Sequence, residues 1–173
     1  GQRYVSAVSY LNGVKQWQAG KTENALRSLD SAALISPAVD IYWREIANAY
    51  LQNVSITAHN ANLSQDVKSK TIQFSINKAV NAAKSATDCN PKNVENWALR
   101  GSVYQQLIGT VQGTEQWSVD AYKEAMNLDP KKLVDFKGKI ISNTLQGLEM
   151  EIGGKSVWFK LIGDFNAYNL LAV

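Results

Sequence analysis

Three prolines, and only three, occur in this chain of 173 residues, and each closes a phrase of the same pattern. The phrases are ALRSLDSAALISP, AVNAAKSATDCNP and SVDAYKEAMNLDP, which end at Pro37, Pro91 and Pro130. Each carries an alanine five residues before its proline. Self-similarity of this kind is typical of repeat proteins, in which each unit packs only on its neighbours. Because proline cannot continue a helix, each phrase predicts a helix that ends before its proline.

Aromatic residues follow the prolines at a fixed distance. Trp43 and Trp97 each lie six residues after a proline and begin the segments WREIANAY and WALRGSVY, and Phe136 takes the corresponding third position. The whole pattern resembles the tetratricopeptide repeat, a helix-turn-helix unit of about 34 residues. Arg100 stands where leucine is usual, and a degenerate first copy keeps Gly13. The resemblance implies a mainly α fold, a solenoid of three helix pairs over residues 1–131.

Two insertions interrupt the repeat. Twenty residues more than the repeat needs lie between Tyr50 and Ala79. Ser64 is a plausible N-cap there, so we expect two over-long helices whose hairpin tip lies near residues 59–63. The shorter insertion, GTVQGTEQW, is expected to form a longer turn.

The last forty residues change character. LEMEI and KSVWFKLI both alternate apolar and polar residues, and Gly153 and Gly154 between them predict a two-residue hairpin turn. For residues 136–148 a further repeat helix competes with a strand, and the β-branched pair Ile140-Ile141 favours the strand. We expect the apolar face of the hairpin to cap the third repeat, or to pair with a second copy of the chain as a homodimer.

The segment DFKGKIISNTLQGLEMEIGGKSVWFKLIGDFNAYNLLAV, residues 135–173, resembles part of the central domain of the Mur ligases, specifically the UDP-N-acetylmuramyl tripeptide ligase. In that family a β-rich run leads into a helix opened by a G-x-F-N-x-Y-N-x-L-A motif. This implies a short terminal helix starting near Phe165. It also implies that Asn166 or Asn169 would lie at the adenine of ATP.

The chain lacks the other parts of such an enzyme. It has no glycine-rich phosphate-binding loop, and phosphoryl transfer depends on groups placed at the γ-phosphoryl. We therefore predict no catalytic residue, and we interpret Asn166 and Asn169 as a helix start. Cys89 and His59 are the only residues of their types, so no cofactor or metal site of the usual Cys/His type is expected.

Charge and hydropathy restrict the class of partner that the chain is expected to bind. The 18 basic residues are scattered, although the net charge is +3, so we predict no nucleic-acid partner. No apolar run is long enough to span a membrane, and the chain is expected to be soluble. A weaker similarity to repeats appended to bacterial O-antigen ligase-type proteins indicates a bacterial source. The compartment stays undetermined.

The resemblance to tetratricopeptide proteins also implies where a ligand would lie, because the first helix of each pair lines a groove. The expected lining residues are Tyr10, Val14, Trp17, Arg44, Asn48, Leu51, Ala98, Ser102 and Gln105. Arg44 and Asn48 match two positions of the carboxylate clamp of chaperone-binding members. Leu99, Val134 and Gly138 fill other clamp positions, which argues against a C-terminal carboxylate as the ligand.

The leading prediction is a non-catalytic scaffold that binds a protein partner, as a peptide or helix, in this groove. Residues 1–131 would form the repeat domain, and residues 132–173 the ligase-like fragment. Two alternatives stay open at this point. The chain could be an inactive fragment of an ATP-dependent peptidoglycan-precursor ligase, or a chimera with no native function as a unit.

Overall fold

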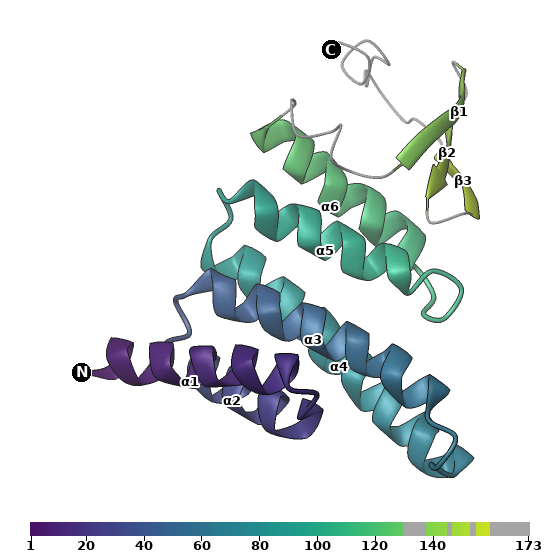
Figure 1. Ribbon diagram of the computed structural model, residues 1–173. Helices are drawn as coiled ribbons and strands as arrows, with labels where there is room; N and C mark the ends of the chain where they lie inside the picture. The colour runs from purple at the N-terminus through teal and green to yellow at the C-terminus, as the bar shows by residue number, and fades with distance from the viewer. Residues whose placement is uncertain (130–137, 145–146, 153–154, 160–173) are drawn as a thin grey trace.

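The computed structural model describes residues 1–129, 138–144, 147–152 and 155–159, with side chains described for residues 1–129. Residues 1–129 form six helices, arranged as three helix-turn-helix pairs (Figure 1). They are α1 (Gln2–Gln18), α2 (Thr22–Ile35), α3 (Asp40–His59), α4 (Gln65–Cys89), α5 (Val94–Gln106) and α6 (Thr114–Leu128). The most extensive helix contacts lie within the pairs α1 with α2, α3 with α4 and α5 with α6. The predicted helical-repeat architecture is confirmed.

Small residues on the first helices let the paired helices approach closely. A Cβ atom added to Gly13 would lie 2.8 Å from Cγ of Leu29, and one added to Gly101 would lie 2.8 Å from the ring of Tyr122. Leu29 and Tyr122 occupy the same position in their proline-ended phrases. A large side chain of the second helix therefore fills the space that glycine leaves on the first helix.

The prolines and tryptophans form a repeated link between successive pairs. Trp43 Nε1 donates a hydrogen bond to the carbonyl oxygen of Pro37 at 2.8 Å, and Trp97 Nε1 donates to that of Pro91 at 2.8 Å. Both indole rings are only half-buried, in contrast to Tyr50, which is 4% exposed. Both tryptophans thus fix the turn between pairs, and Trp43 also packs against the core.

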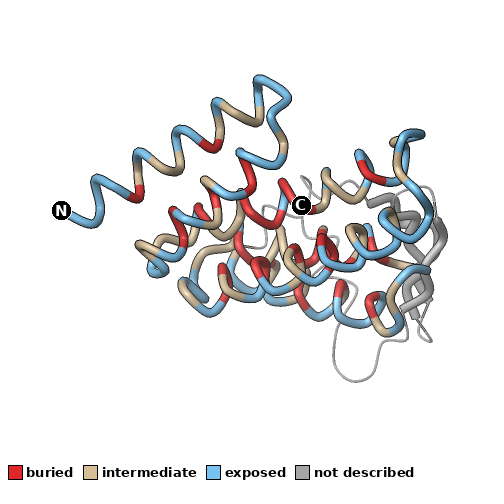
Figure 2. The backbone as a smooth tube through the Cα atoms, turned by 90° about the horizontal axis from the view of Figure 1, so that it is seen from below, coloured by how far each residue is buried: buried red, intermediate tan, exposed pale blue. Residues whose placement is uncertain are grey.

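The core is rich in alanine. Buried positions recur along each helix on the side that faces its neighbours (Figure 2). Several of these alanines have no exposed surface: Ala25, Ala32, Ala33, Ala47, Ala79, Ala83, Ala86 and Ala125. Ile46 and Val103 are the largest fully buried apolar side chains described. Short side chains at these positions allow the helix axes to lie close together.

The longer insertion is absorbed by α3 and α4, which extend together to a tip at residues 60–64 (Figure 1). The predicted N-cap is confirmed, because Ser64 Oγ accepts a hydrogen bond from the backbone N–H of Val67 at 3.3 Å. Along the extension, Asn53 Nδ2 donates to Ser75 Oγ at 2.9 Å.

The shorter insertion forms a turn only in part. Gly109 and Gly113 adopt left-handed backbone angles, with φ of 81° and 85°, which non-glycine residues rarely adopt. Helix α6 already begins at Thr114, so the last four residues of the predicted turn are helical. Thr114 explains this early start, since its Oγ1 donates to the carbonyl of Val111 at 2.7 Å and its side chain is buried.

Three strands follow: β1 (Gly138–Thr144), β2 (Gly147–Ile152) and β3 (Lys155–Phe159). They pair antiparallel in the order β1-β2-β3, with Ile140 opposite Met150 and Met150 opposite Val157. The register shifts between Ile140 and Ser142. The expected turn at Gly153 and Gly154 and the expected helix from Phe165 lie outside the described residues, so the hairpin and the terminal helix stay predictions.

Candidate functional site

The candidate ligand-binding surface is the first-helix face, formed on α1, α3 and α5 by the nine lining residues predicted above. Two contacts hold these three helices next to one another. The rings of Tyr10 and Tyr42 stack with centroids 5.0 Å apart, which joins α1 to α3. Arg44 Nη1 donates to Asn96 Oδ1 at 2.7 Å, which joins α3 to α5.

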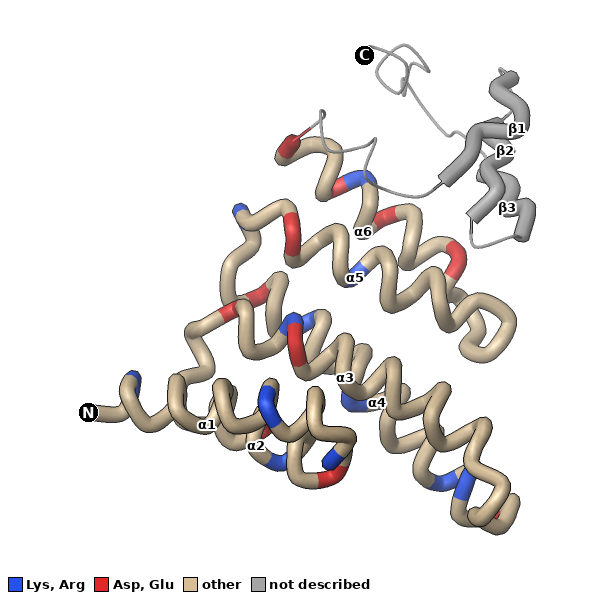
Figure 3. The backbone as a smooth tube through the Cα atoms, in the orientation of Figure 1, with Lys and Arg blue, Asp and Glu red and all other residues tan. Residues whose placement is uncertain are grey.

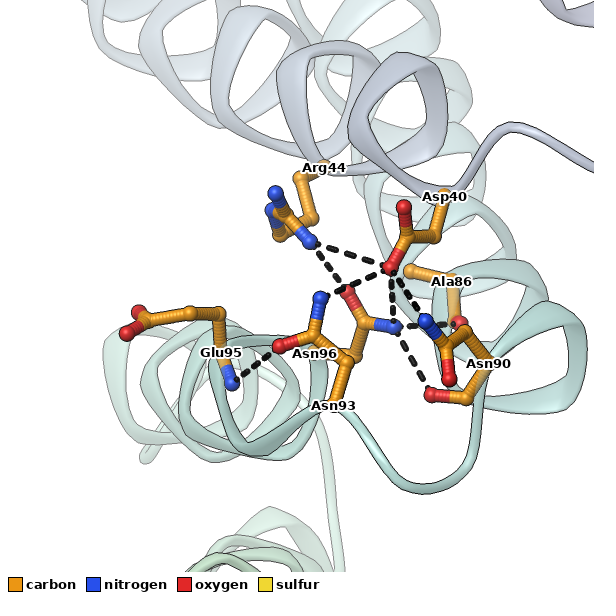
Figure 4. A network of polar contacts seen from close by, with 7 residues as sticks. All are labelled: Asp40, Arg44, Ala86, Asn90, Asn93, Glu95 and Asn96. Carbon is orange, nitrogen blue, oxygen red and sulfur yellow. Dashed lines mark hydrogen bonds and ion pairs between the residues drawn. The ribbon is translucent and has the colours of Figure 1, made fainter.

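Arg44 belongs to a dense polar network at the junction of α3 and α5, shown in Figure 4. One oxygen of Asp40 is its centre. This Oδ2 accepts hydrogen bonds from Arg44 Nη1 at 3.3 Å, Asn90 Nδ2 at 3.3 Å, Asn93 Nδ2 at 2.8 Å and Asn96 Nδ2 at 3.0 Å. Asn93 also caps α5, because its Oδ1 accepts from the backbone N–H of Glu95 at 3.1 Å. The network therefore joins the second repeat to the third.

Asn96 is the residue that this network buries completely, with no exposed surface. Its Nδ2 also lies 2.9 Å from the carbonyl oxygen of Ala86 and 3.0 Å from that of Asn90. Asn96 was not among the residues predicted from the sequence. The repeat pattern gave no signal for it, because the equivalent positions, five residues after Pro37 and Pro130, hold the unlike residues Tyr42 and Asp135. Burial of Asn96 depends on the hydrogen bonds that it makes across the junction of α3 and α5.

The electrostatics show that the Arg44 charge is already compensated. Burial alone would raise the pKa of Asp40, but the hydrogen bonds from Asn93 and Asn96 and the nearby Arg44 guanidinium outweigh burial and lower this pKa below its ordinary value. Asp40 is thus an ionised partner of Arg44, and both side chains are about one-fifth exposed, at 19% and 20%. Arg44 positions the repeats, which leaves it poorly suited to clamp a ligand carboxylate.

The other lining residues differ in exposure. Tyr10, Val14, Trp17 and Leu51 are half-buried, whereas Asn48 is exposed. Burial and the neighbouring Glu45 carboxylate raise the pKa of the Tyr10 hydroxyl. Half-buried aromatic and aliphatic side chains on α1 and α3 offer apolar surface to a ligand, and the Asn48 amide offers hydrogen bonds.

On α5 the polar lining residues are partly engaged. Gln105 Oε1 accepts a hydrogen bond from the hydroxyl of Tyr122 at 2.7 Å, and Ser102 Oγ accepts from Gln106 Nε2 at 3.2 Å. The third lining residue of α5, Ala98, is half-buried. Within the described residues no group accepts from the Gln105 amide nitrogen, so this nitrogen can donate to a ligand.

The other residues considered in the sequence are His59, possible metal ligands, and the asparagines Asn166 and Asn169. His59 is exposed near the hairpin tip, where its Nδ1 lies 2.8 Å from the carbonyl oxygen of Ser55. No cluster of three or more metal-binding side chains occurs among the described residues. Asn166 and Asn169 lie outside the described residues.

Charged side chains of both signs are interspersed along α2 to α6, whereas α1 carries only the basic Arg3 and Lys15 (Figure 3). This agrees with the scattered charge expected from the sequence, and the absence of a nucleic-acid partner stays a prediction. Of the helices that the structure describes, none combines the length and the apolar character that crossing a bilayer requires.

Solved structures with a similar fold are tetratricopeptide domains. The Arabidopsis OM64 TPR domain matches with a TM-score of 0.54 and 17% identity, over 76% of this chain and 88% of that one. The first TPR of Spaghetti (RPAP3), bound to the HSP90 peptide SRMEEVD, matches with a TM-score of 0.53 and 15% identity, over 73% and 81%. At these identities the likeness establishes the fold. No protein-family model matches the chain.

Two curated proteins match a short part of the chain by sequence. Both are UDP-N-acetylmuramoyl-L-alanyl-D-glutamate--2,6-diaminopimelate ligases. The one from Cytophaga hutchinsonii is 71% identical over 41 residues, and the one from Parabacteroides distasonis is 49% identical over 43 residues. These matches span 24% and 25% of this chain but only 8% and 9% of the ligases. The chain thus combines a tetratricopeptide fold with a Mur-ligase-like fragment, and the organisms agree with the bacterial source expected.

Proposed function

We propose that the chain is a non-catalytic interaction scaffold that binds a peptide or helix of a protein partner along the first-helix face. The tetratricopeptide fold carries this proposal, because stacked helix pairs present their first helices as one continuous surface. The composition of that surface supports it. Half-buried Tyr10, Val14, Trp17 and Leu51 supply apolar anchoring surface, and Asn48 and Gln105 supply amides that can bond to a peptide backbone.

The state of Arg44 restricts the class of peptide. The RPAP3 domain binds a peptide that ends in EEVD. In this chain Arg44 is neutralised by Asp40 and bonded to Asn96, so it contributes little net charge to an incoming carboxylate. We therefore propose a ligand anchored by apolar side chains, with hydrogen bonds to its backbone.

A selection experiment tests the proposal without a known partner. Random peptides displayed on phage are enriched on the full chain, and the dissociation constants of the enriched peptides are measured by calorimetry. The test variant replaces Trp17, Asn48 and Gln105 with alanine and leaves the Arg44 network intact. The control variant replaces Glu23 and Arg27 of α2, an exposed ion pair whose side chains are 78% and 73% exposed.

The expected result is binding weakened by about tenfold or more in the test variant, as loss of interface anchors causes, with the control unchanged. Both variants should retain the helical circular dichroism of the parent. Equal affinities for the parent and the test variant would place the recognition surface elsewhere and refute the proposal.

A second candidate rests on a separate observation, the 71% identity with a ligase over 41 residues. It holds that the chain is a fragment of a peptidoglycan-precursor ligase that still contacts ATP through Asn166 or Asn169. Calorimetric titration with magnesium and ATP tests it, beside a variant with alanine at both asparagines. Binding that the double substitution abolishes would favour this candidate, and no heat of binding would eliminate it.

A further inference from the structure

A pocket lies on the other side of α5 from the first-helix face. It is a pocket of about 500 Å³ between the second helices α4 and α6. Trp97, Arg100 and Tyr104 of α5 line it, together with Lys84 of α4 and Trp117 of α6. This volume is within the range of small-molecule sites, roughly 300–1,000 Å³. The pocket is independent of the proposed peptide-binding function.

Arg100 is the unusual residue of this pocket, because leucine is usual at its repeat position. Its guanidinium carbon lies 5.3 Å from the ring centroid of Trp97 and 5.7 Å from that of Tyr104. Its Nη1 donates to Thr87 Oγ1 at 2.8 Å, and its Nε donates to the Tyr104 hydroxyl at 3.1 Å. The guanidinium is thus fixed in place by rings and hydrogen bonds. Among the described residues no carboxylate oxygen lies within 4.0 Å of it.

The preceding repeat has a carboxylate at the position where this pocket has none. Alignment on the prolines equates Asp30 with Lys84, Tyr50 with Tyr104, and Lys78 with Trp117. In the preceding repeat the Tyr50 hydroxyl donates to Asp30 Oδ2 at 2.8 Å, and Lys78 Nζ lies 3.0 Å from the same oxygen. A carboxylate of the chain itself therefore satisfies both the tyrosine and the cation at that position.

In the third repeat the tyrosine remains, but the carboxylate of Asp30 is replaced by Lys84 and the cation Lys78 by Trp117. Lys84 takes the position of Asp30, and Arg100 supplies a further positive charge where the preceding repeat has Ile46. The Tyr104 hydroxyl accepts from Arg100, and no described residue accepts its own proton. The pocket thus presents two cations and a hydroxyl donor around the place where a carboxylate lies one repeat earlier.

We propose that this pocket binds a monocarboxylate with a flat apolar body. The carboxylate takes the position corresponding to Asp30, where it accepts from Tyr104 and pairs with Arg100 and Lys84. The apolar body lies against Trp97 and Trp117. Asp120 and Glu124 of α6 also line the pocket, and their charges disfavour a dianion. The carboxylate belongs either to a free organic acid or to an acidic side chain of a peptide.

The test follows the indole N–H resonances of the full chain during titration with phenylacetate. Phenylacetamide, of the same shape without charge, is the matched probe, and the capped peptide acetyl-Phe-Asp-Phe-amide represents the peptide source. The key variant is Lys84→Asp, which rebuilds the arrangement of the preceding repeat at an exposed position. Lys15→Asp, on exposed α1 surface, makes the same charge change outside the pocket.

We expect saturable shifts with phenylacetate, the peptide or both, binding about tenfold or more weaker for phenylacetamide, and a similar loss in Lys84→Asp but not in Lys15→Asp. Saturation by phenylacetate alone assigns the pocket to free acids. Tighter binding of the peptide assigns it to an acidic peptide. Absence of saturable shifts with either probe, equal binding of the amide, or undiminished binding to Lys84→Asp would overturn the proposal.

Discussion

Substitution of Gly101 by alanine tests the close approach of α5 and α6, because two opposing effects of known size meet at this residue. Alanine favours a helix over glycine by about 0.8–1 kcal/mol. The added Cβ would also lie 2.8 Å from the ring of Tyr122, closer than real Cβ contacts. Overpacking of this kind costs about 1–3 kcal/mol. The net prediction is a loss of about 0–2 kcal/mol of unfolding free energy.

Removal of the Tyr122 ring is expected to reverse the sign of the effect that Gly101→Ala has on the unfolding free energy. In a Tyr122→Ala background the clash no longer exists, and only the helix preference remains. Gly101→Ala should then raise the unfolding free energy by about 1 kcal/mol. The two substitutions are therefore expected to be coupled by about 1–3 kcal/mol, as residues in contact are.

Urea unfolding followed by far-ultraviolet circular dichroism, for the parent, both single variants and the double variant, measures this coupling. The reasoning is refuted if Gly101→Ala stabilises both backgrounds equally, because the ring of Tyr122 would then not occupy the space beside Gly101. Destabilisation in both backgrounds would refute it as well, since it would place the strain in the backbone of α5.

Three further predictions follow. Residues 1–131 produced alone should unfold cooperatively with strongly helical circular dichroism, because repeat units are stabilised by their neighbours, and an unfolded product would contradict the proposed division at residue 131. Asp40 has a lowered pKa in the folded state, so its stabilising effect is present above its unfolded pKa of about 3.9 and is lost as the pH falls through the folded value. Urea unfolding of Asp40→Asn should accordingly show a deficit of about 1–3 kcal/mol at neutral pH that shrinks in acid, and a deficit independent of pH would contradict this. Trp97→Ala should cost about 2 kcal/mol, less than the roughly 3–5 kcal/mol of a fully buried aromatic because Trp97 is half-buried, and a thermal denaturation series with Trp43→Ala as its counterpart measures it.

The sequence predicted those parts of the fold that depend on local patterns. Pro37 and Pro91 mark the ends of second helices, Gly13 was identified as the retained small residue of the first repeat, and Ser64 caps α4. Each of these follows from backbone chemistry or from helical spacing within one segment. Periodicity assigns a residue to a face of its helix, which is enough to pair the helices and place the core.

The same reasoning could not predict the partners of Arg44. Its hydrogen bond to Asn96 spans 52 positions of sequence, and the bond from Asn93 to Asp40 spans 53. Such contacts depend on how α3 and α5 lie against each other, which no local pattern specifies. The clamp resemblance placed Arg44 among the groove-lining residues of the second repeat, which stays a prediction, and it could not indicate that Arg44 also bonds to the neighbouring repeat.

The surroundings of Tyr50 and Tyr104 indicate how repeats of one backbone plan acquire different roles. Tyr50 and Tyr104 are equivalent and almost equally buried, at 4% and 5%, but their neighbouring side chains differ. Asp30 and Lys78 neutralise each other above Tyr50. Beside Tyr104 the acid is replaced by Lys84 and the lysine by Trp117, so this ion pair is lost while the helix positions are kept. A candidate site in such a chain is thus best sought where one repeat lacks a side chain that the equivalent position of its neighbour provides. A ligand of that site is expected to carry the functional group that is absent.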